Sequence, residues 1–198
     1  MSQWLLEQEL KSLEGWKLSA FSAAVTERMF PNFALFANLL EFGDREQTRT
    51  ILDGVWNQLA NSGAKMNFEV QLVNVEDNMP DLEQFDMYGA SPALDAMVAL
   101  YSCINCLLEP NSTEAANIGN LSQECVATFI EVTAEAQLSD EELIRFINDH
   151  EMLLQEEAFQ EEVIKRLHKV ANPTPAFIAE LKLLAANDGV SNIGVSDD

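Results

Sequence analysis

The stretch SPALDAMVALYSCINCLLEP, residues 91–110, decides the fold class of this chain. Apolar residues point in nearly every direction around a helix here, which is typical of a helix with neighbours on most of its sides. Ser91 and Pro92 suit a cap and a first turn, so the helix is predicted to begin there. A helix buried in this way needs several others around it. One polar stripe, about 80° wide, contains Ser91, Asp95, Ser102, Asn105 and Glu109.

The rest of the chain repeats the helical signal, because apolar residues recur at spacings of three and four and strict alternation is nearly absent. Pro31 fits the first turn of a helix, so two separate helices are predicted, at about 16–30 and 31–42. Asp44 with Gln47 and Ser139 with Glu142 have the spacing of capping boxes. The remaining helices are predicted at about 2–14, 44–63, 67–78, 112–136, 139–170 with a bend near 148, and 174–186.

These segments add up to an all-α fold, a multi-helix bundle of about nine helices with mainly antiparallel neighbours and no sheet. The length of 198 residues fits a single all-helical domain over residues 1–198, with a candidate seam at residues 110–112. The tail, residues 190–198, is expected to be mobile unless Ile193 docks on the bundle.

The charge of the chain excludes several kinds of partner. There are 33 Asp and Glu against 11 Lys and Arg, which is a formal net charge of −22. Phosphate backbones and anionic lipids would be repelled, so neither nucleic-acid nor membrane binding is expected. The acidic run at residues 131–162, with Arg145 as its only Lys or Arg, is expected to be a solvated helix face. A field this negative favours a basic protein partner, although solubility alone would account for it.

Localisation and chemistry are constrained by what the sequence lacks. The N-terminal stretch MSQWLLEQELKSLEG does not have the pattern of a signal peptide, so a cytoplasmic location and reduced cysteines are expected. Cys103 and Cys106 have CxxC spacing, but their place late in a buried helix indicates packing rather than redox or metal chemistry. With two histidines and no HExxH, GxSxG or glycine-rich phosphate loop, no catalytic residue, metal site or cofactor is predicted, and the balance is against an enzyme.

The segment at residues 79–90 is the clearest loop in the chain, and it precedes the buried helix. Loops on a rigid scaffold often carry binding residues, and this one holds Asp86 and Tyr88. Together with Arg28 and Asp95 they form the candidate ligand or partner site. Each also has a structural interpretation: Arg28 and Asp86 as surface charges, Tyr88 as a packed ring, and Asp95 as a solvent-facing residue favoured by the helix dipole.

A series of short stretches runs along the first half of the chain: LEGW at 13–16, ERMFPNFALF at 27–36, ILDGVWNQL at 51–59 and FDMYG at 85–89. In the same order, these stretches resemble the YjaG-like bacterial proteins, domain-of-unknown-function family 416. The resemblance implies an all-helical bacterial cytoplasmic protein, and it implies no particular activity, substrate or cofactor. The four candidate residues match recurring polar positions of that family, which a plain helical bundle would not require.

Three functions follow as hypotheses. The preferred one is a small interaction or regulatory module that binds a basic partner protein through an exposed face. The alternative is a small-ligand-binding protein or enzyme with a pocket lined by the four candidate residues, in which the arginine neutralises an anionic ligand. The third is a homo-oligomer, chiefly a dimer, whose interface uses Phe30, Phe33 and Phe36.

Overall fold

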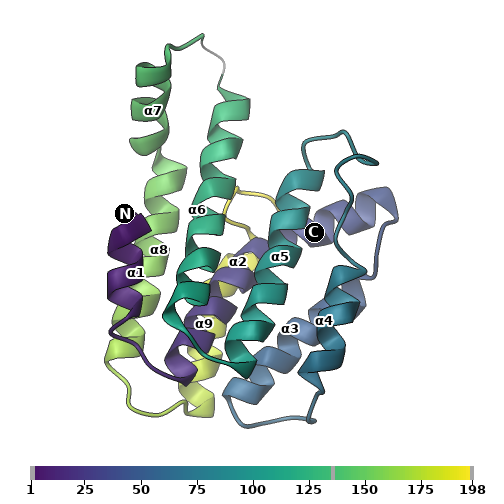
Figure 1. Ribbon diagram of the computed structural model, residues 1–198, viewed down its shortest axis with the longest axis vertical. Coiled ribbons are helices and arrows are strands. Elements are labelled where there is room, and N and C mark those ends of the chain that lie inside the picture. The colour runs from purple at the N-terminus through teal and green to yellow at the C-terminus, as the bar shows by residue number, and fades with distance from the viewer. Residues whose placement is uncertain (1–2, 135–136, 197–198) are drawn as a thin grey trace.

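The computed structural model describes residues 3–134 and 137–196 (Figure 1). No strand occurs within these two ranges, so the predicted all-α bundle is confirmed. The predicted helix limits at residues 2 and 136 and the last two residues of the tail lie outside the described ranges. The described helices are α1 (Gln3–Leu10), α2 (Trp16–Leu40), α3 (Arg45–Leu59), α4 (Phe68–Glu76), α5 (Ala90–Leu108), α6 (Ser112–Thr133), α7 (Asp140–Asn148), α8 (Glu151–His168), α9 (Pro175–Ala186) and the short 3₁₀ turn η1 (Asn187–Gly189).

The longest helix, α2, lies at the centre of the bundle. It packs against α3, α5, α6, α8 and α9, and Figure 1 shows it passing behind α5 and α6. The helix predicted to be buried, α5, packs against α2, α4 and α6. By length and composition α5 could cross a membrane, but half of its apolar stretch is buried inside the protein, as in a core helix. Phe30, Phe33 and Phe36 are also buried, so they belong to the core of the single chain.

The predicted division of residues 16–42 into two helices is wrong, because α2 runs through Pro31 without interruption. A proline inside a helix removes one backbone hydrogen bond and costs about 3 kcal/mol. Burial on both sides of the proline outweighs this cost, since Phe30 and Phe33 are 5% and 0% exposed. The tail also bonds to α2 about one turn before the proline, where the Arg28 carbonyl accepts from the Asn192 N–H at 3.2 Å.

Two predicted caps are replaced by other groups. α5 begins at Ala90 rather than at Ser91, with Gly89 in the cap position and no side-chain cap. The N–H groups of Ala90 and Ser91 donate to carbonyls three residues earlier, at 3.1 and 3.0 Å. The preceding turn therefore satisfies donors that a serine would otherwise cap. α6 is capped by Asn111, the residue before the predicted Ser112.

Other predicted helix starts are confirmed by their hydrogen bonds. Asp44 Oδ1 accepts from the Gln47 N–H at 2.8 Å at the start of α3. Ser139 and Glu142 form a complete capping box at the start of α7. The predicted bend is a break, since α7 ends at Asn148 and α8 begins three residues later.

A partly buried ion cluster around Glu27 joins α2, α3 and α9. The Glu27 side chain is 6% exposed and accepts from both terminal nitrogens of Arg49 at 2.8 Å, and from Trp56 Nε1 at 2.8 Å. Arg49 also donates to Asp53 Oδ1 at 2.7 Å, and Lys182 donates to the same oxygen at 2.8 Å. This bidentate, hydrogen-bonded arrangement fixes the three helices relative to one another.

Replacing Gly119 with alanine is expected to lower the free energy of unfolding by about 1–2 kcal/mol, although alanine favours a helix. A Cβ at this position of α6 would lie 2.7 Å from Leu6 Cδ2, 3.0 Å from Gln160 Oε1 and 3.3 Å from Phe21 Cζ, all in fully buried side chains. Urea unfolding measures the change. The control is Gly89→Ala, where nothing lies within 4 Å of the new Cβ. Equal stability of the two variants would contradict the close packing of α6 on α1.

Candidate functional site

The first candidate residue, Arg28, lies on α2 with 11% of its side chain exposed. Its Nε donates to Glu156 Oε2 on α8 at 2.8 Å. The guanidinium carbon also lies 4.5 Å from the centroid of the Phe159 ring. The arginine therefore joins α2 to α8 through a charged hydrogen bond and a cation–π contact.

The partner of this arginine, Glu156, is completely buried. Its Oε1 accepts from Ser122 Oγ at 2.7 Å and from Gln160 Nε2 at 2.9 Å. Burial raises the pKa of the Glu156 carboxyl, while the charge of Arg28 and the three hydrogen bonds oppose that rise. A carboxyl group with partners on both oxygens is held in one orientation between α2, α6 and α8.

The C-terminal tail completes this arrangement through Asn192, which is 3% exposed. Its Nδ2 donates to Ser122 Oγ at 3.0 Å, and its Oδ1 accepts from Asn32 Nδ2 at 2.9 Å. The tail was expected to be mobile unless Ile193 docks on the bundle. Ile193 is 5% exposed, so it is docked. We call the connected set the buried polar network: Arg28, Asn32, Ser122, Glu156, Gln160 and Asn192.

Two other candidate residues, Tyr88 and Asp95, lie together around Cys125. Asp95 is half-buried and lies beside the Cys125 thiol, which is also near Asn192. Burial raises the pKa of Asp95 to about 6, with a further contribution from the charge of Glu124. Burial, with smaller contributions from Cys125 and Asp95, raises the pKa of Tyr88 to about 12. The Tyr88 ring packs on Phe129 with centroids 6.0 Å apart.

The structure thus connects three of the four candidate residues, but not in one arrangement of converging side chains. Tyr88 and Asp95 lie near Cys125, and Asn192, which is also near that thiol, belongs to the buried polar network that contains Arg28. Asp86 is exposed on the loop between α4 and α5. Arg28 forms an ion pair with Glu156, so the charge of the arginine is neutralised by a group of the same protein.

A different kind of surface lies at one end of the molecule, where α7 stands beside the last turns of α6 and leads into α8 (Figure 1). We call α7 together with residues 130–134 and 149–154 the α7 tip. The apolar residues of α7 span an arc of roughly 160° around the helix. Leu143 and Ile147, near the middle of this arc, are half-buried. Ile144 and Phe146, at its edges, are 59% and 42% exposed.

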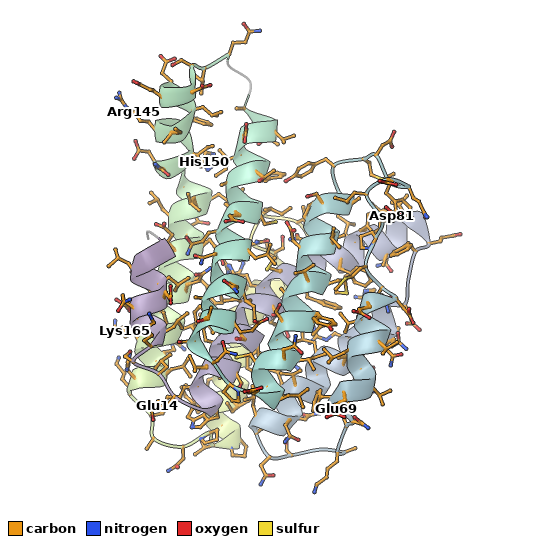
Figure 2. All side chains as sticks on the ribbon, in the orientation of Figure 1. Glu14, Glu69, Asp81, Arg145, His150 and Lys165 are labelled. Carbon is orange, nitrogen blue, oxygen red and sulfur yellow. The ribbon has the colours of Figure 1, made fainter. Side chains whose placement is uncertain are left out.

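The α7 tip is also strongly acidic. Figure 2 shows Arg145 on the outer side of α7, pointing away from α6. Two more large apolar side chains of the tip, Val132 and Leu154, are 57% and 50% exposed. Apolar and acidic groups therefore share this end of the molecule. The exposed acids of the tip are Glu131, Asp140, Glu141, Glu142, Asp149 and Glu151.

Comparison with known proteins identifies the family. The family described as "Protein of unknown function (DUF416)" matches residues 5–196. The chain belongs to this family. It is 34% identical to YjaG of Escherichia coli K12 over 196 residues, which cover 98% of each chain. It is 31% identical to a Haemophilus influenzae Rd protein over 192 residues, which cover 96% of each chain.

A solved member of the family has the same fold as this DUF416 chain. The crystal structure of a DUF416 family protein from Shewanella baltica OS155 matches with a TM-score of 0.87 and 33% sequence identity. The match covers 96% of this chain and 97% of that one. The resemblance recognised from the short stretches between residues 13 and 89 is therefore confirmed over nearly the whole chain.

Two fully buried polar residues of this DUF416 chain, Glu156 and Gln160, were missed by sequence reasoning. Glu156 and Gln160 lie in the acidic run at residues 131–162, for which a solvated face was expected. The signal that could have found them is spacing, because they occupy the same buried stripe of α8 as Leu153, Val163 and Leu167. Polar residues at core positions of an amphipathic helix indicate a buried polar contact.

The contribution of Asp95 to stability is expected to fall as the pH rises from about 4 to about 6. The pKa of Asp95 is about 6 in the folded chain, against an ordinary value of 3.8, so the folded state holds the proton more tightly than the unfolded state. Protonation therefore favours folding below pH 4, and this advantage is lost as the pH passes 6. Urea unfolding of the native protein and Asp95→Asn over this range measures it. A constant difference between the two proteins would contradict the raised pKa.

The cysteines of this DUF416 chain lie inside the protein. Cys103, Cys106 and Cys125 are buried and unpaired as disulfides. Burial raises the pKa of the Cys103 thiol well above its usual range, which disfavours the reactive thiolate. Among the described residues, no group of three His, Cys, Asp or Glu side chains is placed to hold a metal ion.

Proposed function

We propose that this DUF416 protein is a cytoplasmic interaction module whose α7 tip binds a basic amphipathic helix of a partner protein. The observation that carries the proposal is the uncovered part of the apolar arc on α7. Ile144 is 59% exposed and Phe146 is 42% exposed, although both belong to the same apolar arc as the half-buried Leu143 and Ile147. A helix laid along α7 would cover these edges.

The surroundings of the arc define the chemistry of the partner. Six exposed acids surround the apolar side chains of the α7 tip, and Arg145 is the only Lys or Arg of α7. A partner with Lys or Arg beside its apolar residues complements this surface and is steered toward it. A second copy of the chain would bring the same acids face to face, which disfavours self-association at the tip.

The α7 tip is held in shape before a partner arrives. Ser139 and Glu142 form a capping box at the start of α7, and three acids in the first turn favour the helix dipole. The Phe146 ring lies edge-on to His150, with centroids 5.5 Å apart, which ties α7 to the residue that caps α8. A preformed surface loses less conformational freedom on binding.

The Ile144→Ser and Phe146→Ser double variant is expected to bind a synthetic amphipathic Lys/Leu helix at least about tenfold more weakly than the native protein. Fluorescence anisotropy with the labelled peptide at low salt measures the affinity. The variant keeps every charge, so a loss reports the apolar contact. Leu183→Ser on α9, where Leu183 is 73% exposed, is the matched control.

A second peptide separates specific docking from general attraction to an acidic protein. It has the same Lys and Leu content in an order that forms no apolar face. The proposal expects this peptide to bind more weakly and to lose its binding as salt rises. Equal binding of both peptides, or equal loss in the Leu183→Ser control, would refute docking at the α7 tip.

A further inference from the structure

A second candidate binding site lies between α5 and α6, the two helices that stand side by side in Figure 1. A cavity of about 250 Å³ opens there, and it shares no residue with the α7 tip. Polar and apolar side chains both line it, so the polar ones define what it can recognise. The described residues of the wall are Val98 and Ser102 of α5 with Asn117, Ile118, Asn120, Leu121 and Glu124 of α6.

Asn120 is a buried residue of this wall whose amide the fold does not use. It is 8% exposed, yet its side chain forms no hydrogen bond with any described residue. Every other buried polar or charged side chain of the described residues takes part in at least one. Native proteins nearly always satisfy buried polar groups, so an amide left without a partner in a cavity wall indicates a missing ligand.

The Asn120 amide is also within reach of a ligand. Asn32 Oδ1 is the one side-chain oxygen or nitrogen of the described residues that is both inaccessible to solvent and without a hydrogen-bond partner. The amide atoms of Asn120 have no partner and do not share that condition, so they remain accessible. An accessible amide can donate one hydrogen bond and accept another from a molecule in the cavity.

The other polar side chains of the wall are unoccupied as well. Ser102, Asn117 and Glu124 form no hydrogen bond or ion pair with another described residue. On α6, Asn117, Asn120 and Glu124 have the spacing i, i+3 and i+7, which places them along one face of the helix. The rise along the helix from Asn120 to Glu124 is about 6 Å. Polar groups of two helices therefore line one cavity with their hydrogen-bonding capacity unused.

The charge around the cavity favours a cation. Among the described residues that line it, Glu124 is the one charged side chain, so no Lys or Arg of the wall neutralises it. Asp95 lies close by on α5, because burial and then the charge of Glu124 raise the pKa of Asp95. The two carboxyl groups are thus neighbours across the helices. A cation at Glu124 would relieve their repulsion, whereas an anion would add to it.

The size and the apolar part of the wall define the rest of the ligand. An apolar cavity of about 150 Å³ holds a benzene ring. In proportion, the volume of about 250 Å³ here suits a molecule of up to about ten non-hydrogen atoms. Val98, Ile118 and Leu121 offer contacts to an aliphatic chain between the polar ends of such a molecule.

We propose that this cavity binds a small organic cation with a short aliphatic body, whose ammonium or guanidinium group pairs with Glu124 and whose second polar group bonds to the Asn120 amide. The site is independent of the proposed docking at the α7 tip, so either can fail without the other. The ligand is opposite in charge to the anion that the sequence suggested for Arg28, which is not part of this wall.

Three probes with the same butyl chain separate the two contacts. 4-Amino-1-butanol carries an ammonium and a hydroxyl group, butane-1,4-diol lacks the charge, and butylamine lacks the hydroxyl. We expect the native protein to bind aminobutanol at least about threefold more tightly than either of the others, measured by titration in two-dimensional NMR at low salt. We also expect aminobutanol to shift the side-chain amide signals of Asn120. Equal or tighter binding of the diol would overturn the proposal.

Two variants assign the contacts to residues. Glu124→Gln is expected to abolish the preference for aminobutanol over the diol. The matched control is Glu131→Gln, which removes an exposed acid from the same helix outside the cavity and is expected to leave that preference unchanged. Asn120→Leu keeps the approximate size of the side chain and is expected to remove only the preference over butylamine.

The control distinguishes a site from general attraction of cations to an acidic protein. Equal effects of Glu124→Gln and Glu131→Gln would show general attraction and overturn the proposal. An unchanged preference over butylamine in Asn120→Leu would also overturn it, because the hydroxyl would then bind elsewhere. If Asn120→Leu does not fold, the three probes on the native protein and the pair of glutamate variants still decide the question.

Discussion

Replacing Arg28 with alanine is expected to lower the free energy of unfolding by about 3–5 kcal/mol, because it leaves the Glu156 carboxyl buried without its charged partner. Glu156 is completely inaccessible to solvent, and Arg28 Nε donates to it at 2.8 Å. The substitution also removes the cation–π contact of the guanidinium with Phe159. Urea unfolding followed by circular dichroism measures the change.

A control for the Arg28 prediction is present on α8 itself. Arg166 donates to Glu162 at the same distance, 2.8 Å, but their side chains are 38% and 39% exposed. Arg166→Ala is therefore expected to cost no more than about 1 kcal/mol. The double variant Arg28→Met with Glu156→Leu is expected to recover part of the stability lost in Arg28→Ala, because both charges leave together while the buried Ser122 hydroxyl loses its acceptor. Equal losses for Arg28→Ala and Arg166→Ala would contradict the desolvation of the buried pair.

Replacing Asn192 with alanine is expected to cost about 3 kcal/mol, since several buried hydrogen bonds lose one partner at once. The Asn192 amide donates to Ser122 Oγ at 3.0 Å and accepts from Asn32 Nδ2 at 2.9 Å. Loss of the Asn192 amide leaves both Nδ2 and Oδ1 of Asn32 without a hydrogen-bond partner among the described residues. Urea unfolding measures the cost, and mass spectrometry after treatment with a thiol reagent provides a second measurement.

The thiol measurement reports on the position of the tail. Cys125 is 3% exposed and lies near Asn192, so loosening the tail should expose it. Faster modification of Cys125 is expected in Asn192→Ala, with little change at Cys103 in the core. Asn38→Ala, at an exposed position of α2, is the control and is expected to change stability by no more than about 0.5 kcal/mol. Unchanged modification of Cys125 would show that the tail does not depend on Asn192.

The helices could be predicted from the sequence because their signals are local. The capping box of Ser139 and Glu142 and the cap formed by Asp44 are contacts between residues three apart, and both are present. The errors arose where distant contacts outweighed a local preference. Pro31 lies within a helix because the apolar residues on both sides of it are buried by other parts of the chain.

The candidate site was only partly accessible to sequence reasoning. Arg28, Tyr88 and Asp95 are embedded in or beside the buried polar network, but each partner lies far away along the chain. Glu156 is 128 residues from Arg28, and Asn192 is 160 residues from Asn32. The spacing of residues in one sequence carries no information about contacts between residues so far apart along the chain. Glu156 was therefore predicted to be solvent-exposed, like the other acids of residues 131–162.

The sequence by itself determined the helical class, most helix limits, the acidic surface and the family, because these depend on periodicity, capping and composition, which are properties of neighbouring residues. Only the tertiary structure decided which polar groups leave the solvent and what they pair with. Packing of α8 and the tail against α2 buries Glu156 and Asn192, whereas α7 packs mainly against α6 and α8 and keeps Ile144 and Phe146 exposed. Burial depends on all of the helices together, and burial sets the free energy of every charge and hydrogen bond in these sites.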